Sequence, residues 1–147
     1  MPTSNAATTY LEHKLLNFLF KNNSESFATL GDSIYIGLAT AVVDHEAGTV
    51  TEINTGTEDA NYVRQQVTAA NWNETAIGTD TQSVSNAANI EFPSSSGISD
   101  YTVTHVFIVD AASSGNIIFI GALDVNKTIA SGDVFRINTG NLTIELK

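Results

Sequence analysis

Cysteine is absent from this sequence of 147 residues. The chain therefore has no disulfide bonds and no thiolate chemistry, which fits synthesis in a reducing cytoplasm. No run of apolar residues approaches the roughly 18 that a membrane-spanning helix needs. The polar, uncharged beginning, MPTSNAATTY, contains no secretory signal. We therefore expect a protein without a membrane partner.

Lysine and arginine are scarce, with 6 basic residues against 16 acidic ones and a net charge of −10. This balance excludes direct nucleic-acid binding, because neutralising phosphates needs clustered Lys and Arg. Charged residues make up only 15% and hydrophobic residues 42% of the chain, which argues against disorder. The length suffices for one domain with a real core. The remaining neutral polar surface suits packing against other chains.

The last third of the chain contains the clearest structural pattern. Short apolar runs alternate there with turn clusters of Gly, Asn, Asp and Ser. This alternation predicts an all-β fold, an antiparallel β-sandwich that is jelly-roll-like. The predicted strands are Ser33–Ala41, Thr49–Ile53, Tyr62–Thr68, Asn89–Phe92, Val103–Asp110, Ile117–Asp124, Val134–Asn138 and a closing strand in which Leu142, Ile144 and Leu146 alternate with polar residues.

One amphipathic helix is predicted near the N-terminus, over residues 9–21. Thr9 and Glu12 match a capping box at its start. Apolar residues recur behind them at helical spacing: Leu11, Leu15, Phe18 and Leu19. We expect this stripe to cover the sheet, the alternative being a contact with another subunit. Residues 1–8 are predicted to form a flexible or partner-bound arm, and residues 9–147 a single domain.

No motif predicts a metal or cofactor site. The three histidines, His13, His45 and His105, include no pair at i,i+3 or i,i+4 spacing, and no cysteine could join them. His105 could serve as a catalytic base with Asp100 or Asp110, but no nucleophile elbow accompanies it. We therefore predict no zinc site and no serine hydrolase.

Several carboxylates lie near predicted strand ends, where two of them could form a glycosidase pair. Such an enzyme usually needs a groove lined with several aromatic rings, and aromatic residues make up only 8% of this chain. Residues 44–46, Asp-His-Glu, are a candidate for Ca²⁺, although no EF-hand spacing exists. Turn formation is the preferred interpretation. The carboxylates are Glu91, Asp100, Asp110, Asp124 and Asp133.

Four residues are candidates for contacts with a partner. Arg64 lies in a predicted strand and forms either an exposed ion pair or a bidentate contact to an acidic neighbour in an assembly. Tyr62 follows a loop, where a partner could reach it. Thr3 and Asn5 lie in the predicted arm. The arm and the loops 42–61 and 73–88 are the candidate contact elements.

The order of these segments resembles a family of small bacteriophage virion structural proteins, labelled tail-fibre-like or minor structural proteins. The resemblance runs from about Tyr10 to Lys147. The segments that show it best are YVRQ, IEFP, the pair THVFIVDA and NIIFIGAL, and the turn at Gly132 and Asp133. It implies a β-rich virion component that is not an enzyme and is made in the host bacterial cytoplasm.

Two positions in the particle follow from the resemblance. The first is a capsid cement or decoration protein, which binds the outer surface of the major capsid protein lattice, or copies of itself as dimers or trimers. The compact, acidic chain without a repetitive shaft favours this position. The alternative is a tail or tail-fibre protein that contacts the host surface.

Overall fold

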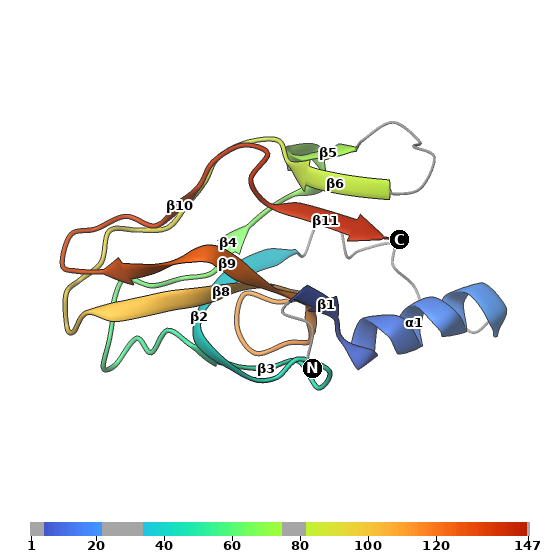
Figure 1. Ribbon diagram of the computed structural model, residues 1–147, viewed down its shortest axis with the longest axis horizontal. Helices are drawn as coiled ribbons and strands as arrows, with labels where there is room; N and C mark the ends of the chain where they lie inside the picture. Colours follow the sequence, from blue (N-terminus) through green and yellow to red (C-terminus); the bar gives the residue numbers. More distant parts are fainter. Residues whose placement is uncertain (1–4, 22–33, 75–81, 147) are drawn as a thin grey trace.

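The structure, a computed structural model, describes residues 5–21, 34–74 and 82–146. Its strands range from 2 to 13 residues in length. Its one described α-helix projects from the side of the molecule (Figure 1). The elements are β1 (Asn5–Ala7), α1 (Thr9–Phe20), β2 (Tyr35–Asp44), β3 (Thr49–Glu52), β4 (Gln65–Gln66), the 3₁₀ turn η2 (Ala69–Asn71), β5 (Trp72–Glu74), β6 (Gln82–Asn86), β7 (Ile90–Glu91), β8 (Tyr101–Val109), β9 (Ile117–Ile129), β10 (Arg136–Ile137) and β11 (Thr143–Leu146).

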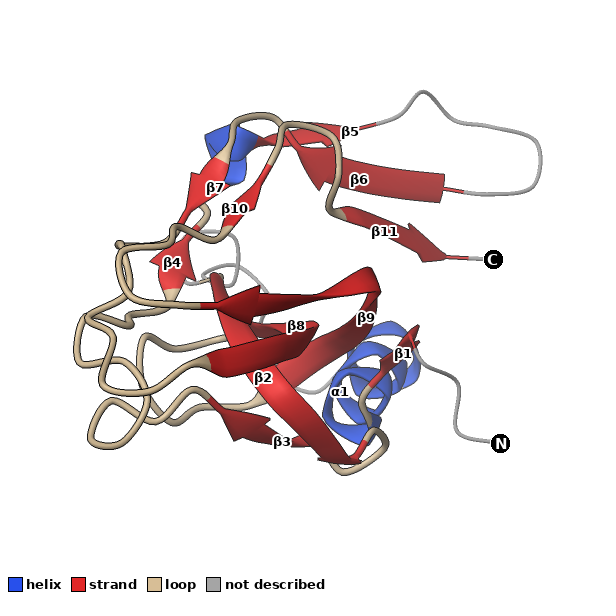
Figure 2. Cartoon of the chain, turned by 60° about the vertical axis from the view of Figure 1, so that its left-hand side comes forward, coloured by secondary structure: helices blue, strands red, loops and turns tan. Residues whose placement is uncertain are grey.

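The strands form two layers (Figure 2). The main sheet has the order β1-β9-β8-β2-β3, with β4 also pairing with β2. A three-stranded sheet, β11-β6-β5, and a two-stranded sheet, β10-β7, lie over it. All pairings among the described strands are antiparallel. The predicted all-β sandwich with one N-terminal helix is confirmed, whereas its jelly-roll type stays a prediction.

Strand β8 lies in the middle of the main sheet, between β9 and β2. Its apolar run from Val106 to Val109 predicts burial on both faces, and all four of these side chains are buried. Val106 and Ile108 face the main core between the layers. Phe107 and Val109 belong to a smaller cluster on the opposite face. The main sheet is therefore covered on both sides at its centre.

Gly37 of β2 allows this second cluster to form. It pairs directly with Phe107 of β8, whose ring lies flat against the glycine backbone. A Cβ atom at position 37 would lie 2.2 Å from the Cζ atom of Phe107. A glycine within a strand often marks a place where another group comes close to the backbone. Here that group is an aromatic ring from the neighbouring strand.

A buried polar side chain fixes the chain within the smaller layer, next to the strand pairings. The side chain of Asn86, at the end of β6, is fully buried. Its amide donates hydrogen bonds to the carbonyls of Asn138 (2.9 Å) and Ala88 (2.8 Å) and accepts one from the backbone N–H of Leu142 (2.9 Å). These bonds hold the chain that leads into β11 against β6.

The helix begins one residue earlier in its hydrogen-bonding pattern than the sequence predicts. Thr8, not Thr9, is its N-cap, and the Thr8 carbonyl accepts the first helical bond, from Glu12. The Thr8 hydroxyl does not cap the helix; it donates to the carbonyl of Ile117 in β9, at 2.5 Å. The predicted capping box is therefore wrong, because the sheet takes the hydroxyl.

The expectation that α1 covers the sheet is also wrong. None of its residues is buried, and Leu11, near its start, is the α1 residue that packs against the main core. The remainder of the helix extends away from both layers (Figure 1). Among the described residues, no helix is long and apolar enough to cross a membrane.

Parts of three predicted contact elements are regular structure. Asn5–Ala7 of the predicted arm form β1, which pairs with β9 of the same chain. Much of the predicted loop 42–61 belongs to the β2–β3 hairpin. Residues 82–86 of the predicted loop 73–88 form β6, and residues 75–81 lie outside the described structure.

Candidate interaction site

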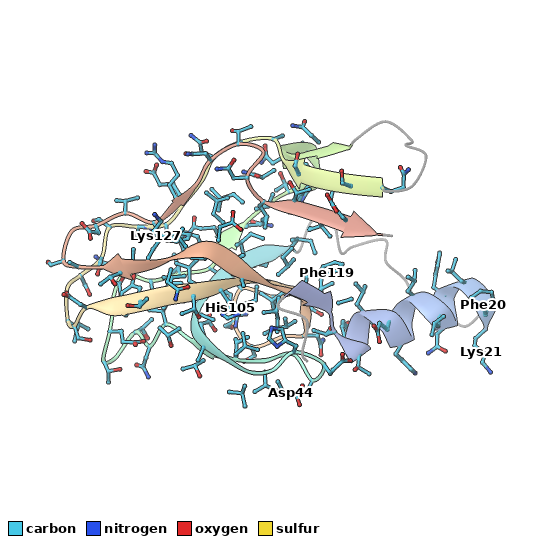
Figure 3. The ribbon with its side chains drawn as sticks, in the orientation of Figure 1. Phe20, Lys21, Asp44, His105, Phe119 and Lys127 are labelled. Carbon is cyan, nitrogen blue, oxygen red and sulfur yellow. The ribbon has the colours of Figure 1, made fainter. Side chains whose placement is uncertain are left out.

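The helix α1 exposes five large apolar side chains, which together we call the α1 patch. Their exposed fractions range from 39% at Leu15 to 77% at Phe20. Phe20 and Lys21 mark the end of the helix that points away from the sheets (Figure 3). The α1 patch consists of Leu15, Leu16, Phe18, Leu19 and Phe20.

The α1 patch is too wide to be the inner face of an ordinary surface helix. At about 100° per residue, its side chains spread over about 200° of the helix circumference, whereas an amphipathic stripe needs little more than about 100°. The exposed apolar area is on the order of 500 Å², comparable with the largest apolar patch on a typical monomer. A helix that is apolar over such an arc is expected to be covered by another protein surface.

The helix also differs from the rest of the chain in charge. Residues 9–21 contain Glu12, Lys14 and Lys21, which give a net charge of +1 with histidine neutral. Since the whole chain carries −10, the remaining residues carry −11. A second acidic molecule therefore meets the least repulsion at α1.

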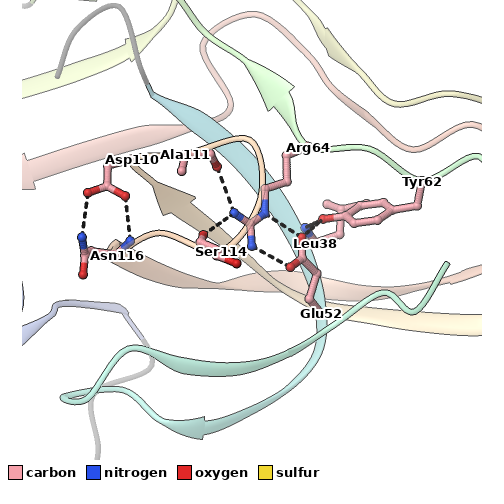
Figure 4. Close-up of polar contacts among 8 residues, drawn as sticks. All are labelled: Leu38, Glu52, Tyr62, Arg64, Asp110, Ala111, Ser114 and Asn116. Atoms are coloured by element: carbon pink, nitrogen blue, oxygen red, sulfur yellow. Dashed lines mark hydrogen bonds and ion pairs between the residues drawn. The ribbon is translucent and has the colours of Figure 1, made fainter. Parts of the chain in front are cut away.

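Arg64 and Tyr62 are two of the residues that the sequence predicts to contact a partner. In the structure they take part in a network of hydrogen bonds within the chain (Figure 4). Arg64 makes a bidentate ion pair with Glu52 of β3, through Nε at 2.8 Å and a terminal nitrogen at 2.7 Å. Its other terminal nitrogen donates to the carbonyls of Ala111 (2.9 Å) and Ser114 (2.7 Å). The guanidinium thus holds the loop between β8 and β9 against β3.

Tyr62 completes the same network. Its hydroxyl donates to Glu52 at 2.8 Å and accepts from the backbone N–H of Leu38 at 2.9 Å. Burial, more than any other cause, raises the pKa of Tyr62. The pKa of Arg64 is raised chiefly by its hydrogen bond to Glu52. Tyr62 therefore stays protonated and Arg64 stays charged at neutral pH.

The structure can now be compared with the prediction for the four contact residues. The Arg64 side chain is only 9% exposed, so its pair with Glu52 is not the exposed ion pair of the first alternative. The second alternative is a bidentate contact from Arg64 to an acidic residue of a neighbouring molecule. Arg64 does make a bidentate contact, but its partner, Glu52, belongs to the same chain. Tyr62 is buried. Asn5 lies in β1, and Thr3 lies outside the described residues. Of the three that the structure describes, Tyr62 and Arg64 meet at Glu52.

A cavity of about 400 Å³ lies between the layers, beside β9 and β11. Its described lining is mostly aliphatic, and Phe119 is the one aromatic residue in it. Asp124 and Glu145 are its carboxylates. A sugar-binding groove usually presents several aromatic faces, which this lining lacks. The cavity therefore offers weak support for glycosidase chemistry.

The sequence contains a signal for the α1 patch that the spacing argument missed. The stripe Leu11, Leu15 and Leu19 fits one-sided burial, but the segment LLNFLF adds apolar residues outside that stripe. A count of the apolar arc, instead of a search for one periodic row, predicts a helix that needs cover on more than one side.

Comparison with known proteins assigns this fold to a family. Residues 6–145 match the family described as Podophage GP4 fiber I protein gp80. Among curated proteins nothing matches. The match includes α1, both layers and the Arg64 network. The protein belongs to the Podophage GP4 fiber I protein gp80 family and is a structural protein of the bacteriophage virion.

Proposed function

We propose that the protein is a non-enzymatic structural subunit of a phage tail fibre and assembles with copies of itself through the α1 patch. The observation that carries this proposal is the exposure of five large apolar side chains on a helix that projects from the domain. Membership in a family of fibre proteins supports the position in the particle.

The occupant that best fits the α1 patch is α1 of a second copy. Two such helices bury apolar surface on each other without bringing the acidic bodies together. The patch, on the order of 500 Å², is smaller than the roughly 800 Å² per partner of a standard interface. Neighbouring surface must therefore contribute, or three helices must meet around a symmetry axis.

The capsid-cement role remains a prediction, as does binding to the major capsid protein. The family description favours the tail-fibre alternative, because it names a fibre protein. A non-enzymatic role is consistent with the lining of the cavity beside β9, which has one aromatic ring.

Charge substitutions in the α1 patch test self-assembly. Leu16→Glu and Phe20→Glu place a carboxylate in the proposed contact, and both positions are exposed, so the domain should still fold. Light scattering coupled to size exclusion should show wild-type oligomers and monomeric variants with unchanged circular dichroism. Val125→Glu is the matched control, because Val125 of β9 is 66% exposed but lies outside the α1 patch. Oligomers that persist in both α1 variants would contradict the proposal.

Copy number tests the position in the particle independently. Quantitative mass spectrometry of purified virions compares this chain with the major capsid protein. A small number of copies per particle, in a multiple of the fibre symmetry, is the expected result. A ratio that matches the capsid lattice would overturn the fibre assignment in favour of the cement role.

A further inference from the structure

Two histidines that are far apart in the sequence meet beside the main sheet. His45 lies in the turn between β2 and β3, and His105 lies in β8. Their ring centroids are 5.8 Å apart, and their planes make an angle of 69°. Both rings are partly buried. The sequence argument against a metal site considered only local spacing, so it could not find this pair.

The hydrogen bonds of Thr104 determine which nitrogen of His105 is available. The Thr104 hydroxyl lies 3.0 Å from the carbonyl oxygen of Thr40, and a carbonyl can only accept. The hydroxyl therefore donates there, and its oxygen accepts from Nδ1 of His105 at 2.8 Å. In the neutral ring this leaves Nε2 with a free lone pair.

The Nε2 atom of His45 is buried and has no hydrogen-bond partner within the described part of the chain. A buried ring nitrogen without a partner requires a physical explanation. We propose that His45 and His105 bind a divalent transition-metal ion of the Zn²⁺ class through their Nε2 atoms.

The separation of the two rings is compatible with such an ion. With Zn–N bonds of about 2.0–2.1 Å and an angle near or somewhat above tetrahedral, two ligating imidazoles have centroids about 5–6 Å apart. The observed 5.8 Å lies in this interval. Each ring can rotate about its metal–nitrogen bond, so the angle between planes imposes no conflict. The bond from His105 Nδ1 to Thr104 is the outer-shell contact that metal-binding histidines usually make.

The composition of the site selects the class of metal. Imidazole ligands suit Zn²⁺, Ni²⁺ and Cu²⁺, whereas Ca²⁺ and Mg²⁺ prefer oxygen. Among the described residues, no group of three or more His, Cys, Asp or Glu is placed to hold a metal. In this proposal the described residues supply two ligands, and solvent completes the coordination when the ion binds. Asp44 and Glu46 flank His45 and raise the local cation concentration.

The bound ion would connect the base of α1 to the sheet. The turn that carries His45 also bonds the start of α1, because the Glu46 carbonyl accepts the backbone N–H of Thr9 at 3.0 Å. A metal between His45 and His105 joins this turn to β8. It should therefore stabilise the fold where the helix begins, independently of whether α1 mediates assembly.

Thermal unfolding of the untagged protein with added Zn²⁺ tests the site. At a zinc concentration of about ten times Kd, linkage predicts a rise in Tm of about 3–6 °C. His45→Ala and His105→Ala should each abolish the rise. His13→Ala is the matched control and should keep it, since His13 is exposed on α1. Mg²⁺ and Ca²⁺ at the same concentration should give no rise.

Long-range ¹H–¹⁵N NMR of the wild-type histidines provides a second readout that does not depend on the variants folding. The proton of His105 should lie on Nδ1 before zinc is added, and zinc should shift the Nε2 signals of His45 and His105. Thr104→Val should weaken zinc binding about 10–100-fold, and Thr104→Ser should restore it. A zinc effect confined to His13, or an equal rise in Tm in both alanine variants, would overturn the proposal.

Discussion

At the residue scale, the two arginines of the chain each pair with a glutamate, in opposite surroundings. Arg64 is 9% exposed and pairs with Glu52, which is 28% exposed. Arg136 and Glu91 are each 50% exposed. Removing one partner of a buried pair leaves an uncompensated charge away from water, whereas an exposed partner is simply rehydrated. The two sites therefore form a natural matched comparison.

We expect Arg64→Met to lower the free energy of unfolding by about 3–5 kcal/mol. The change leaves Glu52 without its bidentate partner and releases the carbonyls of Ala111 and Ser114. Arg136→Met should cost under about 1 kcal/mol. Urea denaturation followed by circular dichroism measures both. Equal losses at the two positions would show that the Arg64 network is no more important than a surface pair.

A buried acid, Asp59, gives the fold a pH dependence. It is 1% exposed, and it accepts hydrogen bonds from the Tyr101 hydroxyl (2.9 Å) and from the backbone N–H groups of Ser96 (2.9 Å) and Asn61 (3.0 Å). Burial alone raises the pKa of Asp59, but these hydrogen bonds outweigh it, and the net shift is downward. The charged form is therefore the one that the fold prefers.

Because the folded pKa of Asp59 lies below the unfolded value of about 3.9, its contribution is fully present above that pH. It is lost as the pH falls through the folded pKa. We expect Asp59→Asn to be less stable than wild type at pH 7 and to lose part of the steep acid dependence below about pH 4. Urea denaturation at a series of pH values measures this. Asp100→Asn, at an exposed position, is the control and should retain the wild-type profile.

At the element scale, a side-chain hydroxyl helps to fix the connection from β1 into α1. Thr8 is 1% exposed and bonds the Ile117 carbonyl, whereas Thr9 is exposed on the first turn. We expect Thr8→Val to cost about 1–2 kcal/mol, because the partly buried carbonyl of Ile117 loses this donor. Thr9→Val should cost under about 0.5 kcal/mol.

Thermal denaturation of the two valine variants distinguishes the structure from the sequence-based capping box. Thr8→Ser retains the hydroxyl and should recover most of the loss. If Thr9→Val proved the more damaging change, the hydroxyl of Thr9 would be the cap after all, and the position of the helix start would need revision.

The elements that the sequence predicted correctly are those whose signal lies in residues adjacent in the sequence. The apolar run of β8 indicated burial on both faces, and the alternation at Leu142 and Ile144 indicated a half-buried closing strand. The features that it missed depend on distant residues. The Thr8 bond to Ile117, the Arg64 pair with Glu52 and the meeting of two histidines all require the fold. Local patterns therefore predicted the sandwich, but not its polar contacts.

At the scale of the whole molecule, two properties oppose each other in self-assembly. The α1 patch favours association, because its apolar surface is exposed to water. The net charge of −10 opposes it, because every copy repels every other. Salt screens the repulsion, since the Debye length falls from about 10 Å at 0.1 M to about 3 Å at 1 M. Burial of apolar surface is much less sensitive to screening.

We therefore expect self-association through α1 to strengthen several-fold when NaCl rises from about 50 mM to about 500 mM. Sedimentation velocity over a range of protein concentrations at each salt level measures the change. Phe20→Glu serves as the control and should stay monomeric throughout, because it adds charge at the contact. Association that weakens with salt would indicate a charge-driven contact, in which Lys14 and Lys21 of one copy bind the acidic body of another.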